Sequence, residues 1–185
     1  MERQMDEGRI LPHESARDGP SAARRARQPR SAAAELSAQL AAGNLQGALA
    51  LLNARTRFRF TGVYAVEGKV LRNVELYDRE NPTLTVGGGV CPIDESYCSF
   101  IAATGCAFAT GDSRADDRLF AHAKRDSVLS YAGVPIRLAS GCVVGTLCHY
   151  DGRPRFVTSD ELGLLEEIAP AFAASLGQRA PRADA

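Results

Sequence analysis

The sequence predicts an α/β fold of the α+β kind, in which helices pack on an antiparallel β-sheet. Residues Ser127–Phe156 contain two apolar segments separated by Ser140-Gly141, which suits the turn of a hairpin. A second pair of alternating segments lies earlier in the chain, between Arg57 and Tyr77. Helical patterns stand before the first pair and after the second, so helices should flank the sheet.

The overall totals fit one domain of 185 residues with 22 basic and 22 acidic side chains. This balance gives no field that would attract nucleic acid or an anionic membrane. No apolar run approaches the roughly 20 residues that span a bilayer, and the first thirty residues lack the core of a signal peptide. We therefore expect a cytoplasmic protein. Its five cysteines, an odd number, favour free thiols over a disulfide framework.

The two ends differ from the rest of the chain. Residues 1–30 are rich in Arg, Ala and Pro without a periodic apolar face, and we expect them and residues 178–185 to be disordered. The ordered domain should then cover residues 31–177. Within Ser31–Asn53 leucines recur near helical spacing around Gly43-Asn44, which predicts one interrupted helix or two short ones.

The first predicted hairpin follows. Arg57–Val66 alternates, with one face formed by Phe58, Phe60, Tyr64 and Val66. Glu67-Gly68-Lys69 should turn the chain back into Val70–Tyr77, in which Val70, Val74 and Leu76 should share a face.

The middle of the chain mixes short elements. Asp94 can cap a helix over Glu95–Ala103 that ends at Gly105. A short strand should occupy Cys106–Thr110. After it, Asp112–Arg118 predicts a polar turn that leads into a brief helix near Leu119–Lys124.

The second hairpin is the predicted centre of the sheet. Its first strand, Gly133–Ala139, places Val134, Ile136 and Leu138 on one face. The second, Val143–Tyr150, is largely apolar on both faces, which is typical of a strand covered on both sides. Its alternation puts His149 on the face of Gly145 and Leu147, and Cys148 on the other.

The last helix has a clear beginning. Thr158-Ser159-Asp160-Glu161 is a capping box, and an apolar seam follows at Leu162, Leu165, Ala169, Phe172 and Leu176. Pro170 removes a backbone donor within this segment, so we expect the helix to bend or to split there.

These segments together resemble a GAF domain. The resemblance rests on Ser130–Ile136 (SYAGVPI), on Gly141 with Gly145–Cys148 (GTLC), and on Phe156 with the Leu162–Leu165 helix. It also includes Ala109–Asp112 followed by Asp116-Asp117-Arg118, and it covers roughly Ser31–Gly177.

The resemblance implies an antiparallel sheet of about six strands with the first and last helices on one face. It implies a small-molecule pocket on the other face, roofed by the middle helix and loops, here Val90–Ala103 and Thr110–Ser130. GAF domains commonly regulate an attached effector, so this chain would act through a separate one. The first and last helices often form a homodimer, with Leu36, Leu40 and the terminal seam as interface candidates.

The cysteines permit an enzymatic alternative. Free methionine-(R)-sulfoxide reductases are GAF enzymes that use a thiolate and a resolving cysteine, and Cys91, Cys98 and Cys106 fall near the implied pocket roof. The reactive cysteine of that family precedes the strand of Val134, where Arg118–Ser130 has none. The Cys spacings match no paired-cysteine zinc pattern, so neither a metal nor another cofactor is expected.

Our leading hypothesis is therefore a non-catalytic sensory module that binds a small ligand in signal transduction; a ligand-free dimerising scaffold is a third alternative. The candidate binding residues are hydroxyl, thiol and ionisable groups near the implied pocket: Tyr97, Cys98, Ser99, Asp112, Ser130, Tyr131 and His149. Each has a structural alternative. Asp112 can cap a turn, and His149 can be a polar group at the end of a mostly buried strand.

Overall fold

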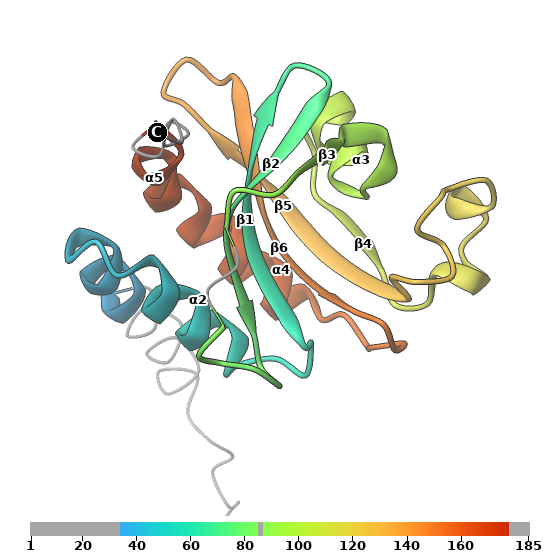
Figure 1. The fold of residues 1–185 in the computed structure, drawn as a ribbon, viewed down its shortest axis with the longest axis horizontal. Coiled ribbons are helices and arrows are strands. Elements are labelled where there is room, and N and C mark those ends of the chain that lie inside the picture. Colours follow the sequence, from blue (N-terminus) through green and yellow to red (C-terminus); the bar gives the residue numbers. More distant parts are fainter. Residues whose placement is uncertain (1–33, 85–86, 178–185) are drawn as a thin grey trace, which may run out of the picture.

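Six strands form one antiparallel sheet in the order β3-β2-β1-β6-β5-β4 in the computed structural model, which describes residues 34–84 and 87–177 (Figure 1). The strands are β1 Phe60–Glu67, β2 Val70–Asp78, β3 Val90–Pro92, β4 Phe108–Thr110, β5 Ser130–Arg137 and β6 Val143–Asp151. The expected α+β fold and its sheet of six strands are confirmed. The predicted disordered ends, 1–30 and 178–185, lie outside the described residues.

Strands β1 and β6 form the middle of the sheet, as the two-sided apolar pattern of β6 predicts. Strand β5 begins at Ser130, three residues before the predicted start, and ends before Leu138. The amide of Leu138 donates to the carbonyl of Cys142 at 3.0 Å, and Gly141 adopts a positive φ of 86°. Leu138 therefore belongs to the turn, which leaves it 47% exposed instead of packed beside Ile136.

The β1–β2 hairpin contains a bulge that changes which side chains share a face. Its register pairs Val63 with Glu75 and Tyr64 with Asn73, so Val74 is the extra residue. Val74 packs with the helices in the core, whereas Leu76 pairs with Gly62 and lies on the other face beside Tyr64, although the alternation predicted that Val70, Val74 and Leu76 would share one face. The turn at Gly68, with a φ of 66°, is as predicted.

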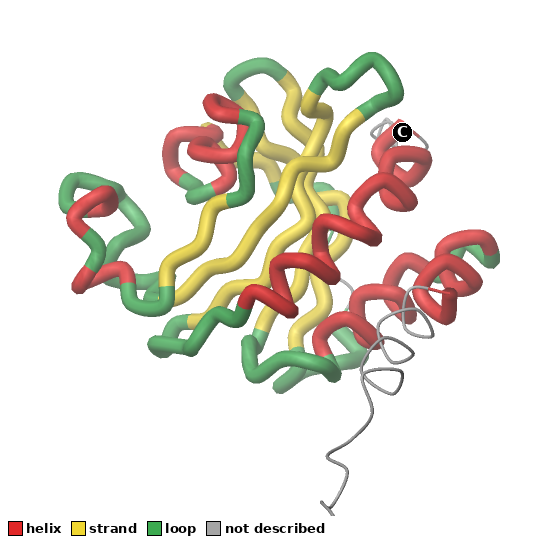
Figure 2. The backbone as a smooth tube through the Cα atoms, turned by 180° about the vertical axis from the view of Figure 1, so that it is seen from behind, coloured by secondary structure: helices red, strands yellow, loops and turns green. Residues whose placement is uncertain are grey.

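Helices from both ends of the chain cover one face of the sheet (Figure 2). They are a helix over residues 34–41, α2 Leu45–Asn53, α4 Ser159–Ile168 and α5 Ala173–Gly177. The first two are separate because Gly43 takes a φ of 72° and the Asn44 side chain caps α2 by accepting from the Gly47 amide at 2.9 Å. Within the described residues, no helix has both the length and the apolarity to cross a membrane.

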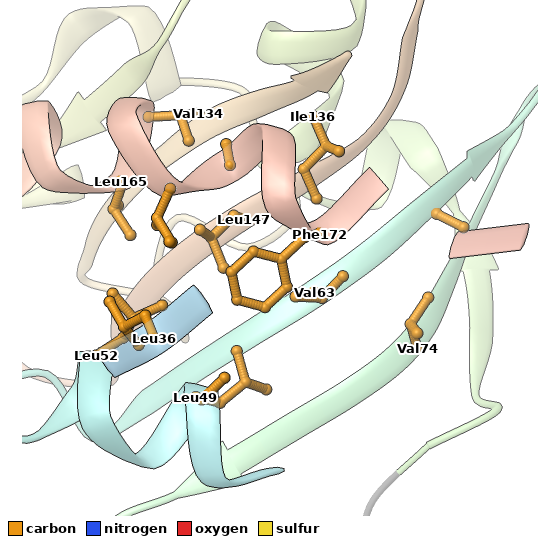
Figure 3. Packing of buried hydrophobic residues seen from close by; sticks show 14 residues of the cluster. Leu36, Leu49, Leu52, Val63, Val74, Val134, Ile136, Leu147, Leu165 and Phe172 are labelled. Atoms are coloured by element: carbon orange, nitrogen blue, oxygen red, sulfur yellow. The ribbon is translucent and has the colours of Figure 1, made fainter. Parts of the chain in front are cut away.

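The capping box of α4 is present, because Thr158 Oγ1 accepts from the Glu161 amide while the Glu161 carboxylate accepts from the Thr158 amide. A 3-10 segment, Ala169–Phe172, divides α4 from α5 at Pro170, which is the split that the missing donor predicts. Phe172 is fully buried against the sheet (Figure 3).

Three residues of the terminal seam pack inside the protomer together with Leu36. Leu36, Leu165, Ala169 and Phe172 are all at most 2% exposed in the cluster between the helices and the sheet. Side chains buried in this way are unavailable for contact with a second chain. Leu40, Leu162 and Leu176 are only partly buried and remain accessible.

The opposite face carries α3 Cys98–Thr104, which begins later than the predicted Glu95. Asp94 lies instead in a 3-10 turn, Ile93–Glu95, and Tyr97 occupies the N-cap position of α3. Gly105 ends α3 in the left-handed conformation with a φ of 69°, as predicted.

The brief helix predicted near Leu119–Lys124 is wrong. Asp112 and Asp116 each accept a hydrogen bond from the amide two residues later, and each begins a 3-10 turn. Such local side-chain bonds compete with an α-helix, so residues 113–119 form two short 3-10 turns and the chain then continues in irregular turns.

Candidate functional site

A cavity of about 190 Å³ lies between the sheet and α3, on the face opposite the terminal helices. Since one water molecule takes about 30 Å³ of liquid volume, a small organic molecule could fit. The wall combines apolar, phenolic, thiol and ionisable groups: Tyr64, Leu71, Cys91, Glu95, Ser96, Tyr97, Cys98, Lys124, Val128, Tyr131, Cys148 and Tyr150.

Cys148 lies in a slot in the middle of the sheet. It pairs across the strands with Gly62 on one side and Gly133 on the other, so neither neighbour places a side chain beside its thiol. The aromatic rings of Tyr64 and Tyr131 occupy that room instead, because a Cβ atom at Gly62 or Gly133 would collide with them. The two glycines therefore let two phenol rings flank one thiol.

Cys98 reaches the same place from the first turn of α3. Its Sγ accepts a hydrogen bond from Thr146 Oγ1 at 3.1 Å and lies 3.2 Å from Tyr131 Oη. Hydrogen bonding from Cys148, and further bonds from Ser96, Thr146 and Tyr131, lower the pKa of the Cys98 thiol despite its burial. Burial raises the pKa of Cys148 well above its usual value. Of the two thiols, Cys98 therefore ionises more readily.

Two further phenols meet elsewhere in the cavity wall, where Tyr64 Oη lies 3.1 Å from Tyr150 Oη. Burial raises the pKa of both hydroxyls, which keeps them protonated at neutral pH. Their mutual bond uses one of the two hydroxyl hydrogens, so the other can be donated to a ligand.

Charged groups reach the cavity from its rim. Glu95, in the 3-10 turn before α3, is exposed, and Lys124 is half-buried in the loop before β5. Cys91 of β3 is also half-buried, and desolvation raises the pKa of its thiol. The site therefore offers an acidic and a basic group near its opening, and hydroxyls and thiols inside.

The structure brings together three of the predicted binding residues, Tyr97, Cys98 and Tyr131, in the wall of the cavity. Tyr97 is oriented by donating its hydroxyl to the Val128 carbonyl at 3.1 Å. Ser99 follows Cys98 in α3, outside the group that lines the cavity.

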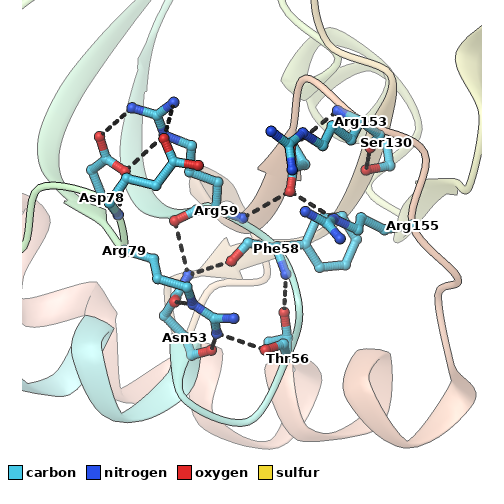
Figure 4. A network of polar contacts seen from close by, with 11 residues as sticks. Asn53, Thr56, Phe58, Arg59, Asp78, Arg79, Ser130, Arg153 and Arg155 are labelled. Atoms are coloured by element: carbon cyan, nitrogen blue, oxygen red, sulfur yellow. Dashed lines mark hydrogen bonds and ion pairs between the residues drawn. The ribbon is translucent and has the colours of Figure 1, made fainter.

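Two of the other predicted residues make structural contacts away from this wall. Asp112 caps the turn at Ser113–Ala115. Ser130 is fully buried and donates its hydroxyl to the carbonyl of Arg153 at 2.7 Å, where β5 meets the chain after β6 (Figure 4).

His149 lies on the opposite face from the cavity, contrary to the pocket-side position that we expected. Its Nδ1 is 2.7 Å from Thr61 Oγ1, and that oxygen already accepts from Asn53 Nδ2 at 2.8 Å. Burial lowers the pKa of His149 to about 3, so its ring is neutral. The ring stacks on Phe58, with the centroids 5.8 Å apart.

The cysteines do not act as one group. Cys91 and Cys98 line the cavity, whereas Cys106 lies beyond the end of α3 and is exposed, as is Cys142. In residues 34–84 and 87–177, no three His, Cys, Asp or Glu side chains gather as metal ligands would.

Sequence reasoning missed three main components of the wall, Tyr64, Cys148 and Tyr150. Two of them, Cys148 and Tyr150, lie in β6, in or just after the GTLC segment that carried much of the resemblance. The signal that could have found them is the pair of glycines opposite Cys148, because a small residue beside a strand thiol leaves room for a neighbouring ring.

Comparison with known proteins supports the fold. A family model described as "GAF domain" matches residues 30–176. A search of curated proteins gives no match. Solved structures do match, and the three described next are all below 20% identical, so they support the fold alone.

Three of the matching structures come from different kinds of protein that share this fold. The GAF domain of a phosphoenolpyruvate-protein phosphotransferase from Acinetobacter is 10% identical, with a TM-score of 0.64, over 80% of this chain and 91% of that one. The free methionine-R-sulfoxide reductase from Neisseria meningitidis, in complex with its substrate, is 19% identical, with a TM-score of 0.63, over 90% and 95%. The phycocyanobilin-bound GAF domain of a cyanobacterial phytochrome is 15% identical, with a TM-score of 0.61, over 82% and 94%.

The family model covers most of the chain, and the sheet order, the helices on one face and the cavity on the other agree with it. This chain belongs to the GAF domain family.

Proposed function

We propose that this protein is a sensory module that binds a small molecule in the cavity under α3 and reports its presence to a separate effector. The observation that supports this is the cavity itself, about 190 Å³ in volume, with neutral phenols and thiols inside and charged groups at its rim. A pocket that is mostly apolar with a few oriented polar groups is the usual form of a ligand site.

The lining favours a compact ligand that accepts hydrogen bonds. The free hydrogen of the Tyr64 and Tyr150 pair is one donor, and Lys124 at the rim can meet an anionic group. Glu95 can meet a cationic group on the same molecule. A zwitterion such as a free amino acid satisfies all three, and its size suits the cavity better than that of a cyclic nucleotide.

A thermal-shift screen tests this proposal. Free amino acids, methionine sulfoxide and cyclic nucleotides are the probes. A ligand at 100 times its Kd should stabilise the fold by about 2.7 kcal/mol. Tyr150→Phe, which removes one cavity hydroxyl, should weaken the shift, and the exposed Cys106→Ser variant should retain it. If no compound of these classes raises the Tm, the sensory proposal fails.

The second candidate is thiol-dependent reduction of free methionine-(R)-sulfoxide. It is favoured by Cys98, whose thiol pKa is lowered and which shares the cavity with Cys91. The thiolate would attack the sulfoxide sulfur, and attack by a second thiol on the enzyme-bound sulfur would release methionine, leave a disulfide and lose the oxygen as water.

A turnover assay separates this candidate from the sensor. Consumption of free methionine-(R)-sulfoxide with a thioredoxin system should stop in Cys98→Ser and Cys91→Ser and continue in Cys106→Ser. Binding without consumption by the unmodified protein would contradict the enzymatic reading and leave the sensor in place.

We further propose that the protein acts in the cytoplasm and as a homodimer through the exposed sides of its first and last helices. Leu40 and Ala174 border a groove of about 260 Å³ there, whereas Leu36, Leu165 and Phe172 are buried in the protomer. Light scattering should give twice the protomer mass, and Leu40→Glu should reduce it. A single-chain mass across the concentration range would contradict the dimer.

A further inference from the structure

Cys98 and Cys148 form a pair of fully buried thiols on two different elements. Cys98 begins α3, and Cys148 lies at the centre of β6, two residues after Thr146. Thr146 and Cys148 project from the same face of the strand, and Thr146 Oγ1 donates to Cys98 Sγ at 3.1 Å. Cys98 is therefore held over the part of the strand from which the Cys148 thiol projects, and both thiols belong to the wall of the same cavity.

The surroundings make the two thiols unequal. Cys98 Sγ accepts a hydrogen bond from Thr146 Oγ1 and lies 3.2 Å from Tyr131 Oη, whereas Cys148 sits between the rings of Tyr64 and Tyr131. Hydrogen-bond donors favour a thiolate and desolvation opposes it. Cys98 has the character of an attacking thiol and Cys148 that of a resolving one.

The cavity gives a small reagent a route to both sulfurs. Cys98 is 1% and Cys148 0% exposed to bulk solvent, but both line the cavity, whose wall extends to the exposed Glu95. A hydroperoxide such as hydrogen peroxide is little larger than water and can enter such a space. Bulky thiol reagents would be excluded from the folded protein.

We propose that Cys98 and Cys148 are a redox-reactive dithiol that a small hydroperoxide oxidises to an intramolecular disulfide across α3 and β6. The Cys98 sulfur attacks the peroxide, a sulfur–oxygen bond forms, the oxygen–oxygen bond breaks, and water leaves as the sulfenic acid is formed. Cys148 then attacks that sulfur, a disulfide forms, the sulfur–oxygen bond breaks, and the oxygen leaves as a second water with the Cys148 proton. Two thiols lose two electrons and two protons, and one peroxide is reduced to two waters.

Oxidation would draw the first turn of α3 toward the sheet and reshape the cavity. The proposal does not require that a ligand bind there, so it can succeed or fail independently of the sensory function. The disulfide would join residues 50 positions apart in the sequence.

The test is peptide mapping of the full chain after a brief exposure to hydrogen peroxide, an acid quench and alkylation in denaturant. The expected product is a peptide pair joined through Cys98 and Cys148, two hydrogens lighter than the separate peptides and separated again by dithiothreitol. Cys106 and Cys142, which are exposed, should still be alkylated.

Variants assign the roles. In Cys148→Ser, Cys98 should accumulate as a sulfenic acid that dimedone traps, and in Cys98→Ser neither product should form. Thr146→Val, which removes a donor to Cys98 but keeps the side-chain shape, should slow disulfide formation by about tenfold. Cys142→Ser is the matched control and should match the unmodified chain. The proposal is overturned if Cys106 or Cys142 oxidises first, if Cys98 joins Cys91 instead, or if both buried thiols stay reduced.

Discussion

Asn53 connects three parts of the chain through a single side chain. It ends α2 and is 1% exposed. Its Nδ2 donates to the carbonyls of Phe58 and Arg59 and to Thr61 Oγ1, at 3.1, 3.3 and 2.8 Å, while its Oδ1 accepts from Arg79 Nε at 2.8 Å (Figure 4). The end of a helix, the start of β1 and the residue after β2 are thereby fixed to one another.

We expect Asn53→Ala to lower the free energy of unfolding by about 3 kcal/mol, because it removes the side-chain donor to the Phe58 carbonyl and the Thr61 hydroxyl and the acceptor of Arg79 Nε. Urea unfolding followed by circular dichroism measures this. Asn44→Ala, at the exposed start of the same helix, is the control and should cost about 1 kcal/mol, the usual value for a lost N-cap. Equal losses in the two variants would show that the Asn53 network contributes little.

At the scale of elements, two glycines on neighbouring segments have opposite roles. Gly145 in β6 lies directly beneath α5, where an added Cβ would be 2.7 Å from Leu176 Cδ1 and would also collide with the Tyr64 carbonyl. A Cβ atom added at Gly163 in α4 would have no other packed atom within 4 Å. Gly145 therefore permits close packing of α5 on β6, whereas Gly163 only weakens α4.

Gly163→Ala should therefore raise the free energy of unfolding by roughly 1 kcal/mol, because alanine has the higher helix propensity. Gly145→Ala should lower it and increase hydrogen exchange in α5, since that helix must move away from the sheet. Both effects can be measured by chemical denaturation with hydrogen-exchange mass spectrometry. Destabilisation by Gly163→Ala would contradict the open surroundings that the structure gives this position.

Element boundaries were predictable where local chemistry is strong. Gly68, Gly105 and the Thr158–Glu161 capping box each ended or began an element where the sequence indicated. The predicted cap at Asp94 and the brief helix after Arg118 were wrong. In both places acidic residues also suit short turns, and at Asp112 and Asp116 the carboxylates bonded to nearby amides in 3-10 turns.

At the scale of the whole molecule, the sequence predicted the sheet and its two layers but not which side of β6 bears the cavity. Strict alternation separates His149 from Cys148 correctly. It cannot say which of these faces the terminal helices will cover, because that depends on long-range packing. Tyr97, Cys98 and Tyr131, which were chosen from the pocket that the resemblance implies, line the cavity, whereas His149 was assigned to the wrong side and Cys148 was not among the candidates.

The burial of His149 predicts how global stability depends on pH. Its folded pKa is about 3, against an ordinary value of 6.5, so between these values the unfolded chain binds a proton that the folded chain does not. The contribution of the neutral His149 to the free energy of unfolding is therefore complete above about pH 6.5 and is lost as the pH falls below that value. We expect a loss of about 2 kcal/mol between about pH 7 and about pH 5.

Denaturant unfolding at a series of pH values checks this expectation. His149→Gln should flatten the curve over this range. His122→Gln is the control, because burial lowers the pKa of His122 as well but only moderately, and the variant should retain most of the slope. Asp78, whose pKa Arg59 holds well below 3.8, contributes only in more acidic solution. If His149→Gln leaves the dependence of the free energy of unfolding on pH unchanged, His149 is not its cause.

The two edge strands of the sheet, β3 and β4, offer little backbone with which another chain could pair. Both outermost strands, β3 and β4, are only three residues long, and β3 ends in Pro92, which has no amide hydrogen to share. On β4 the Arg118 guanidinium donates to the outward Ala109 carbonyl at 2.8 Å and lies over the Phe108 ring. A strand from a second molecule would find few free backbone groups at either edge of the sheet. We therefore expect little fibril formation through edge-strand pairing at high protein concentration.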